Sequence, residues 1–412
     1  MSERRTATIV GGGLAGLSAA SSLAQAGWRV LVLERAAEFG EVGAGLAITG
    51  NGMAALDALG VAAHVRSAGY ETFAAGTRDR RGRWLLRIPP VGTDGAAAVN
   101  RVCGVHRQRL HAVLLAAAGE CDLLTGARVI DVQAGVPSGM PASVTWSDGA
   151  GLHTRTSDLL VAADGARSTA RGLLFPRAGV ALQYSGWTSW RAVVDDDRIT
   201  SAGFAVWWGP SAEFGAVRIS DSQVYWYGYF RHPAGQAFAD ELAAATEQFA
   251  GWAPEVSATV AATSATKLLR HDVHHLPGGL PTFVCGRTVL IGDAAHAMLP
   301  TMGQGANTSL EDGVCVGRLI AQPVDAGMPL PDALAAFDSA RRPRCRQIAR
   351  RSLLTARFGA HVPGGLPQVL RNAAIRAIPA GPAVAAGAAV LRWTAPARGP
   401  DTDRPSSGRL VP

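Results

Sequence analysis

Apolar residues near the start of the chain follow the order strand, turn, helix, strand. Residues 6–10 (TATIV) and 28–34 (WRVLVLE) are short apolar runs typical of buried strands. Between them, leucine and alanine recur at helical spacing after a glycine-rich turn, and Gly27 marks the end of the helix. A unit of about 30 residues in this order predicts a parallel α/β sheet.

The same patterns return along the chain. Residues 157–165 and 287–293 are apolar runs that stop at an acid, so each predicts a buried strand. Residues 81–88 predict one half of a hairpin that turns at Arg81 and Gly82. Leucine and alanine spacing predicts helices at residues 50–60, 106–119, 307–322 and 329–358.

The middle of the chain has a different pattern. Between about residues 180 and 275, apolar and polar residues alternate, which predicts an antiparallel sheet with one covered face. Six of the ten tryptophans and four of the five tyrosines lie between Tyr184 and Trp252. This aromatic sheet is the candidate platform for an organic substrate.

The change of pattern predicts a discontinuous architecture. The fold class is α/β, with a Rossmann-type domain, an inserted antiparallel β-sheet domain for the substrate and C-terminal helices. The tail is rich in Pro, Ser and Arg and is expected to be disordered. The predicted parts are residues 1–74, 101–178 and 276–330 for the first domain, 75–100 and 179–275 for the second, 331–394 for the helices and 395–412 for the tail.

Charge and cysteine content narrow the class of protein. The chain has 412 residues and a net charge of +7, and Lys267 is the only lysine among its 39 basic residues. A basic chain suits an anionic partner such as a phosphorylated cofactor, whereas scattered arginines without an aromatic-rich basic module disfavour nucleic acid. Five cysteines without a Cys-x-x-Cys pair disfavour a disulfide framework or a zinc site and fit a reducing cytoplasm.

Membrane and metal signals are weak. Glycines follow the twin arginines near the start, where a signal peptide needs an apolar core, and the apolar run at residues 377–391 is too short to span a bilayer. The histidines at 271, 274 and 275 lack the carboxylate pattern of a metal site, so no metal is expected.

Gly11, Gly13 and Gly16 form a G-x-G-x-x-G pattern between the first strand and the first helix. The first glycine permits a tight turn, the second lets the backbone approach a pyrophosphate, and the third packs the helix on the strand. Glu34 follows Gly16 by 18 residues, where an acid accepts a ribose hydroxyl. The alternative is a glycine-rich turn without a ligand, but this context favours nucleotide binding.

Two further motifs follow strands. Asp164 and Gly165 begin ADGARSTAR, for which a turn with a helix N-cap is a sufficient explanation. Residues 292–307 (GDAAHAMLPTMGQGAN) place one acid, Asp293, after a strand and then remove most side-chain bulk. Such a segment lets the backbone approach something flat and polar, although an ordinary cap is the alternative for Asp293.

With these three motifs in order, the chain resembles the class A flavoprotein monooxygenases, the family of para-hydroxybenzoate hydroxylase, over roughly residues 5 to 360. The segment YSGWTSWRAVV also resembles the entry to the middle domain of salicylate and urate hydroxylases. The resemblance implies FAD as the cofactor. It further implies that Asp293 lies against the ribityl and pyrophosphate part, with the loop from Pro300 beside the isoalloxazine ring and a helix beginning near Asn307.

The resemblance also implies individual roles. Glu34 and Arg35 hold the adenosine side, and Arg107 lies near FAD unless it is a surface helix arginine. The implied cofactor-binding set is Gly11, Gly13, Gly16, Glu34, Arg35, Ala47, Arg107, Val129, Asp164, Asp293, Gly303, Gln304, Gly305, Ala306 and Asn307.

Arg218, Tyr225 and Pro300 are the candidate residues at the reaction centre. By resemblance, Arg218 matches an arginine that faces the flavin and the substrate. It is on a strand of the aromatic sheet, where a solvated arginine is an equal alternative. Tyr225, Tyr227 and Tyr229 share one face of a strand and Trp226 takes the other. We expect the tyrosine face to form the pocket wall, the alternative being that both faces only pack.

By resemblance, the chain is a single-component monooxygenase that reduces FAD with NADPH or NADH and hydroxylates an aromatic or heteroaromatic small molecule with O2 through a flavin C4a-hydroperoxide. Epoxidation or oxygen insertion beside a carbonyl would use the same residues, and a flavin-binding regulator is the alternative outside enzymes. The sequence leaves monomer and homodimer open.

Overall fold

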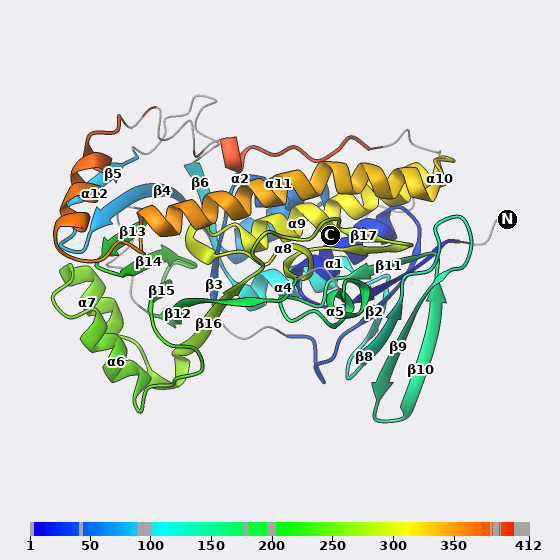
Figure 1. Ribbon diagram of the computed structural model, residues 1–412, viewed down its shortest axis with the longest axis horizontal. Helices are drawn as coiled ribbons and strands as arrows, with labels where there is room; N and C mark the ends of the chain where they lie inside the picture. The colour runs from blue at the N-terminus through cyan, green and yellow to red at the C-terminus, as the bar shows by residue number, and fades with distance from the viewer. Residues whose placement is uncertain are drawn as a thin grey trace.

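The computed structural model describes residues 4–40, 44–88, 100–176, 180–195, 203–379, 381, 387 and 389–398 (Figure 1). The predicted first unit is confirmed as β1 (Thr6–Val10), α1 (Leu14–Gln25) and β2 (Arg29–Leu33). All but the first residue of each of these strands are buried, as expected for apolar runs covered on both faces.

A six-stranded sheet brings the three motifs to one edge. Its order is β17-β18-β11-β1-β2-β7, and all neighbours are parallel except the edge strand β17. Because parallel strands end at the same edge, the turns that follow β1, β11 and β18 lie together, where open α/β sheets bind ligands. The remaining strands are β7 (Asp122–Leu124), β11 (Leu159–Ala162), β17 (Val284–Cys285) and β18 (Thr288–Leu290).

Helices cover this sheet and cross the molecule. α9 (Gly305–Cys315) packs on α1 and continues through a π-helical segment, η5 (Val316–Ala321), into α10 (Gln322–Asp325). α11 (Leu330–Phe358) then runs along the length of the molecule (Figure 1). The other helices here are α2 (Gly50–Ala58), α3 (Ala62–Ala68), α4 (Arg107–Ala117), α5 (Thr169–Leu174) and α8 (Asp293–His296).

A second, larger sheet contains the aromatic strands, in the order β16-β12-β15-β14-β13-β4-β6-β3 with β5 paired to β4. β4 pairs with β6 through its first residues and with β13 from Ala74 onward, so one strand joins the two parts of the sheet. We propose that the first and second domains divide near Ala74. The strands are β3 (Gly45–Ile48), β4 (Tyr70–Asp79), β5 (Trp84–Arg87), β6 (Arg101–His106), β12 (Gln183–Val194), β13 (Phe204–Gly209), β14 (Ala212–Arg218), β15 (Val224–Arg231) and β16 (Leu269–His275).

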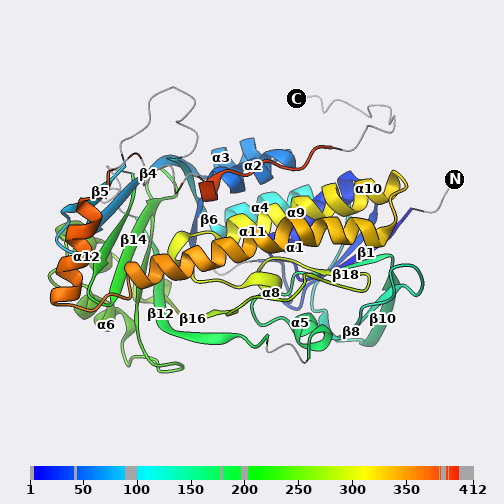
Figure 2. The same cartoon turned by 45° about the horizontal axis from the view of Figure 1, so that its top comes forward.

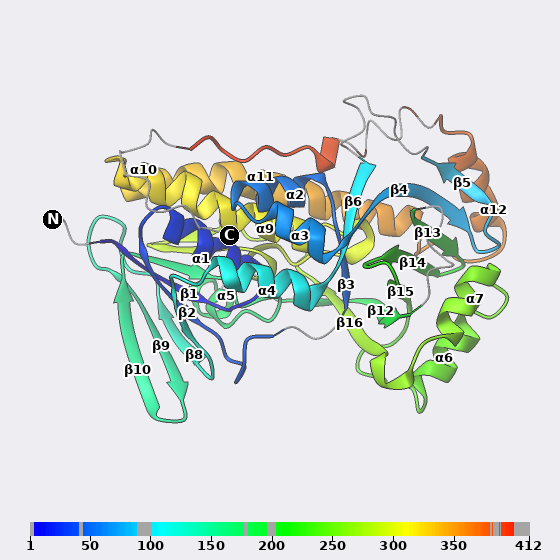
Figure 3. The same cartoon turned by 180° about the vertical axis from the view of Figure 1, so that it is seen from behind.

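The centre of the aromatic sheet is covered on both faces, which corrects the expectation of one covered face. β14 is buried at six consecutive positions. α6 (Glu241–Gln248), α7 (Pro254–Ala261) and the turn between them, with Phe249 and Trp252, cover one face, and Ala356 of α11 packs with Tyr229 on the other. α6 and α7 lie in the segment that was predicted to be sheet. Figure 3 shows them at the end of the molecule opposite β8 (Arg128–Gln133), β9 (Ala142–Asp148) and β10 (Gly151–Ser157), which form a three-stranded sheet.

The chain ends beyond α12 (Leu366–Arg376), which packs beside β5 (Figure 2). Ala395 packs against the core, whereas most of the predicted tail lies outside the described residues. Among the helices that the structure describes, none combines the length and apolar character needed to cross a bilayer.

Candidate active site

One cavity extends from the glycine turn to the aromatic sheet. Its wall includes Gly13 at the start of α1, the loop of residues 298–306, and Tyr225 on β15. The cavity therefore joins residues from both large sheets, which are far apart in sequence. Of the candidate residues, those that line it are Gly13, Ala47, Arg107, Tyr225, Asp293, Pro300, Gly303, Gly305 and Ala306.

Two glycines of the first motif are required by the turn itself. Gly11 has a φ of +103°, and a Cβ there would lie 2.5 Å from the carbonyl oxygen of Ala163. A Cβ on Gly16 would lie 1.9 Å from the carbonyl oxygen of Gly11. Gly13 is the N-cap of α1 and lines the cavity, so the free amides of the first turn open toward it.

Glu34 braces this turn from the end of β2. Its Oε2 accepts a hydrogen bond of 2.7 Å from the Gly12 amide, and its Oε1 accepts one of 2.9 Å from the Ala36 amide. Glu34 is half-buried and Arg35 is exposed, and neither is part of the cavity wall. Their contact with adenosine stays a prediction.

The Asp-Gly motif makes a helix cap. Asp164 accepts hydrogen bonds from the Ser168 hydroxyl and from the Ala170 amide, and Ser168 in turn caps α5 by accepting from the Arg171 amide. A turn with a helix N-cap therefore accounts for the contacts that the structure shows for Asp164. Arg171 links the motif to the next one, because its Nη1 donates to the carbonyl oxygen of Ala294 at 2.9 Å.

The loop after β18 presents mainly backbone to the cavity. Asp293 is exposed toward it, and the lining continues through residues 298–303, Gly305 and Ala306. α9 begins at Gly305, two residues before the expected start at Asn307. Its free amides therefore open onto the cavity earlier in the loop than the resemblance implied.

Two candidate side chains hold this loop instead of lining the cavity. Asn307 is fully buried, accepts from the Thr49 amide at 3.0 Å and donates to the carbonyl oxygens of Gly303 and Ala47. Gln304 is also fully buried and accepts from Asn51 Nδ2 at 3.0 Å. Both side chains tie the loop to β3 and α2, so they shape the backbone that faces a ligand.

A buried ionic cluster lies behind the loop that follows β18. Asp312 on α9 accepts from His296 on α8, from the Gly292 amide and from Arg341 on α11 at 2.7 Å. Although burial opposes it, His296 and Arg341 lower the pKa of Asp312 to about 2. Burial likewise acts to lower the pKa of His296, but Cys345 and Asp312 raise it well above its usual value, so the pair is ionised.

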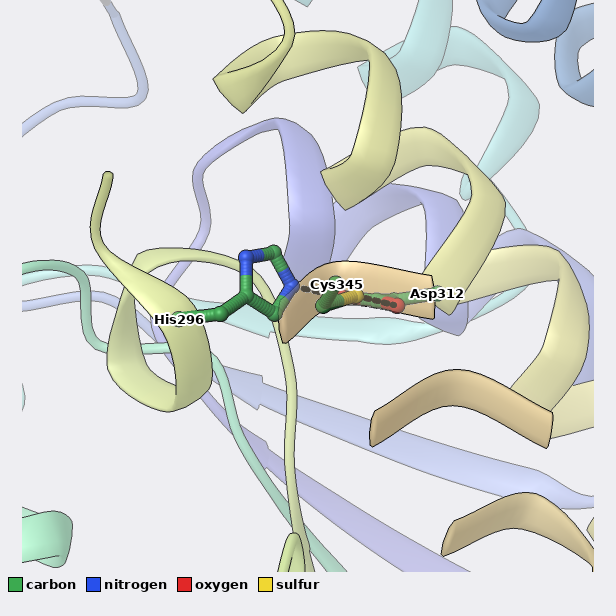
Figure 4. Close-up of side chains that lie close together, drawn as sticks. All are labelled: His296, Asp312 and Cys345. Carbon is green, nitrogen blue, oxygen red and sulfur yellow. Dashed lines mark hydrogen bonds and ion pairs between the residues drawn. The ribbon is translucent and has the colours of Figure 1, made fainter. Parts of the chain in front are cut away.

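Figure 4 shows that His296, Asp312 and Cys345 come together from α8, α9 and α11. Their ligand atoms lie within 4.8 Å of one another, the spacing of a metal site. A metal ion would have to displace the Arg341 and His296 cations from Asp312. We therefore interpret the cluster as a structural ion network, with Arg341 also paired to Glu311.

Tyr225 and Tyr227 form the far wall of the cavity, and Trp226 packs on the opposite face of β15 in the core with α6 and α7. The expected alternation is therefore confirmed for these three residues. Tyr229 shares the tyrosine face but lies outside the cavity wall, because it stacks on Trp187 with ring centroids 5.0 Å apart.

A buried acid fixes the Tyr227 ring. The Tyr227 hydroxyl donates to Glu213 Oε1 at 2.8 Å, and Trp208 Nε1 donates to Glu213 Oε2 at 2.8 Å. The ring crosses Gly215 on β14, where a Cβ would lie 2.3 Å from it. Burial raises the pKa of Glu213 to about 7, and the two hydrogen bonds only partly oppose this. Glu213 was not identified from the sequence.

Comparison with known proteins identifies the family. A family model described as an FAD binding domain matches residues 4–352. Aurachin C monooxygenase/isomerase of Stigmatella aurantiaca is 34% identical over 359 residues, which cover 86% of this chain and 89% of that protein. The 2-heptyl-3-hydroxy-4(1H)-quinolone synthase of Pseudomonas aeruginosa is 31% identical over 384 residues, covering 91% and 94%. The chain belongs to the class A FAD-dependent monooxygenases.

Solved structures have the same fold as this monooxygenase. HpxO of Klebsiella pneumoniae, solved with FAD and uric acid, gives a TM-score of 0.81 at 23% identity and covers 94% of this chain and 96% of that one. A salicylate hydroxylase substrate complex gives a TM-score of 0.73 at 20% identity, covering 96% and 100%. The predicted fold class is confirmed.

The lining of the cavity fits FAD. Gly305 has ordinary helical backbone, and a Cβ there would meet only Asp293 Oδ1, at 4.0 Å. Packing within the protein therefore gives no reason for a glycine at this position, whereas a flat ring lying against the backbone does. The open first turn of α1 offers amides to phosphates at the other end of the same cavity.

The arginines of this monooxygenase are only partly those expected. Arg107, which was expected, and Arg191, which was not, line the cavity, whereas Arg218 is not part of its wall and its contact with flavin or substrate stays a prediction. Arg218 donates to the Tyr70 hydroxyl at 3.2 Å and lies 4.9 Å from the centre of that ring. Arg191 was missed because its place depends on the pairing of β12 with β15, where it lies opposite Tyr227.

Val129 and Ala47 were the two positions implied for backbone contacts. Ala47 on β3 lines the cavity. Val129 on β8 is half-buried against the core and lies outside the cavity wall, so its contact with FAD stays a prediction.

Proposed function

We propose that the chain is a single-component FAD-dependent monooxygenase that uses NADPH or NADH as reductant and O2 to hydroxylate an aromatic or heteroaromatic small molecule. The observation that carries this proposal is the cavity, because the glycine turn at the start of α1, a bare backbone loop and an aromatic wall all line it. These three kinds of lining suit a dinucleotide cofactor and a flat substrate.

The residues that would hold FAD line the cavity or, in the case of Glu34, brace the glycine turn at its end. The amides at the start of α1 face the phosphates, Glu34 lies at the end of β2 for the ribose, and Asp293 and the loop of residues 300–306 lie beside the ring. When bound, FAD supplies the chemistry that the protein lacks, namely electron uptake from a nicotinamide and activation of O2.

The aromatic end of the cavity supports a flat substrate with an acceptor group. Tyr225 and Tyr227 offer rings for stacking, and Phe204, Val206 and Val217 add apolar surface that keeps water away. Arg191 is half-buried and lines the cavity together with Tyr225 and Tyr227. A phenolate, carboxylate or ring carbonyl of the substrate would accept a hydrogen bond from its guanidinium.

The relatives suggest where to begin the search for a substrate. One relative is named for making a 3-hydroxy-4(1H)-quinolone, a flat bicyclic ring with a carbonyl. Such a ring fits the chemistry of the wall in this chain, so 4-quinolones stand first among the compounds to test. Phenols, indoles and purines follow, because they too are electron-rich flat rings.

The proposal is tested by adding each compound to purified protein that has been loaded with FAD. We expect one compound class to stimulate NADPH or NADH oxidation and to yield a product containing one atom from ¹⁸O2. Hydroxylation, epoxidation and insertion beside a carbonyl are then distinguished by the product's structure. Flavin binding without substrate-stimulated oxidation by any compound would contradict the proposal and favour a flavin-binding regulator.

A further inference from the structure

α12 has its polar and apolar faces reversed relative to an ordinary surface helix. Arg371 points inward, is 8% exposed, and donates to the carbonyl oxygen of Gly359 at 2.7 Å. Arg376 also bonds to the protein, with its Nη2 donating to Asp79 Oδ2 at 3.0 Å. The charged side chains of this helix thus attach it to the molecule, where leucine would normally be found.

Large apolar side chains of α12 face outward instead. Leu366, Val369 and Leu370 are 69%, 62% and 60% exposed, and their spacing of three and four residues places them on one face of the helix. The end of α11 adds Phe358, which is 68% exposed, and Leu354 one turn before it. These five residues are here called the C-terminal apolar surface.

The charge of the surrounding sequence indicates what covers this surface. Residues 339–400 contain eleven arginines and no aspartate or glutamate, although the whole chain has 32 acids. Arg341, Arg342, Arg344 and Arg376 pair with acids from outside this segment. Arg350 and Arg357 are exposed, and a shallow groove on α11 is lined by arginines 342, 346, 350 and 351.

We propose that the C-terminal apolar surface docks this monooxygenase on a lipid bilayer that carries anionic headgroups, without spanning it. An amphipathic helix lies in the membrane interface when its apolar face enters the acyl boundary and nearby arginines contact phosphates. This docking goes beyond the proposed function and does not depend on it.

Charge complementarity favours a membrane over a second copy of the chain. In a two-fold dimer the same surface meets itself, so the arginine-rich segments of both copies would come together. Like charges at an interface oppose association, whereas anionic headgroups neutralise these arginines. Figure 2 shows α12 and β5 at the end of the molecule away from β1 and β18, so docking there leaves the six-stranded sheet in solution.

The test is co-sedimentation of the full-length, FAD-loaded protein with vesicles of phosphatidylcholine, with and without phosphatidylglycerol. The test variant carries Leu366→Asp and Leu370→Asp. The control carries Leu152→Asp, because Leu152 on β10 is 71% exposed and lies outside the surface. FAD content and light scattering are measured for each protein to show that it is folded and to give its oligomeric state.

We expect the parent protein and the Leu152→Asp control to bind phosphatidylglycerol vesicles, and binding to fall at high salt and on pure phosphatidylcholine. The double variant should bind at least tenfold more weakly while keeping its FAD. Failure of the parent protein to bind, or equal binding by the double variant, would overturn the proposal. A parent dimer that the double variant converts to a monomer would also overturn it, because a second copy would then be the occupant.

Discussion

Glu213 is a buried carboxylate that makes no ion pair among the described residues, and its pKa is raised to about 7 by burial. A folded-state pKa above the usual 4.5 means that the folded protein keeps a proton which the unfolded chain loses first. The contribution of Glu213 to the free energy of unfolding is therefore fully present below pH 4.5 and is lost as the pH rises through about 7. The total loss is roughly 3 kcal/mol.

Glu213→Gln should remove this pH dependence. Glutamine can accept from Trp208 and donate to the Tyr227 oxygen, so the ring keeps its place. The free energy of unfolding, measured with denaturant between pH 5 and 8, should shift in favour of the variant as the pH rises. Glu247→Gln, at an exposed position of α6, is the control and should parallel the parent protein. If the free energies of unfolding of Glu213→Gln and the parent protein instead changed in parallel with pH, folding would not raise the pKa of Glu213.

Asp293 is the one acid of the bare loop and lines the cavity. We expect Asp293 to accept a charge-assisted hydrogen bond from FAD worth about 1.5–3 kcal/mol, so Asp293→Ala should lower the affinity about ten- to a hundredfold. Fluorescence titration of the apoprotein with FAD measures this, with Asp57→Ala, an exposed site on α2, as the matched control. An unchanged affinity would assign Asp293 to the helix cap alone.

Arg191 and Arg218 offer a direct comparison of two arginines on neighbouring parts of one sheet. Once a substrate is known, Arg191→Met should raise KM about ten- to a hundredfold, because the substrate loses a charged donor. Arg218→Met should leave KM near that of the parent, since Arg218 contacts Tyr70 outside the cavity wall. Steady-state kinetics at saturating FAD compares the two, and a larger effect at Arg218 would restore the role expected from the sequence.

At the scale of elements, local sequence patterns were sufficient to predict the features that a single segment forms by itself. The glycine turn, its strand and its helix were predicted at nearly their observed bounds, because Gly11 and Gly16 are needed by the turn itself. α6 and α7 were missed because the whole segment from about residue 180 to 275 was assigned to the aromatic sheet. Asp240, which caps α6, and Pro254 at the start of α7 were the local signals that could have revealed them.

Features that join distant segments could not be read from the sequence. Arg191 and Glu213 take their places from strand register, and register depends on pairing between β12, β14 and β15. The resemblance assigned the arginine at the flavin to Arg218 from its position on a single strand. The cavity wall, however, is formed by residues from several strands. The same reason applies to Asn307 and Gln304, whose buried bonds to Thr49 and Asn51 cross more than 250 residues.

The start of α9 supplies a prediction about an element. Gly305→Ala adds a methyl group that meets nothing but Asp293 Oδ1 at 4.0 Å, and alanine favours a helix. The apoprotein should therefore be as stable as the parent or slightly more so, while its affinity for FAD falls. Titration with FAD and denaturant unfolding of the apoprotein measure the two effects. Gly149→Ala, where a Cβ also meets nothing within 4 Å, should change neither affinity nor FAD content.

At the scale of the whole molecule, the cavity lies between the six-stranded sheet and the aromatic sheet, so FAD bound in it would contact both parts of the fold. A ligand that binds only the folded chain stabilises it by RT ln(1 + [L]/Kd), about 2.7 kcal/mol at a free concentration of one hundred times Kd. Removing FAD should therefore lower the thermal midpoint, and adding FAD back should restore it in proportion to the logarithm of its concentration.

FMN measures the contribution of the adenosine part of the cofactor in this experiment. FMN has the ring and one phosphate but lacks the adenosine that Glu34 is expected to hold, so it should raise the midpoint less than FAD at equal concentration. Asp293→Ala should shift the FAD response to about ten- to a hundredfold higher concentrations with the same slope. Differential scanning calorimetry of the apoprotein with each flavin gives both comparisons. A midpoint that does not respond to FAD would mean that the folded protein does not bind FAD, since binding to the folded state alone must stabilise it.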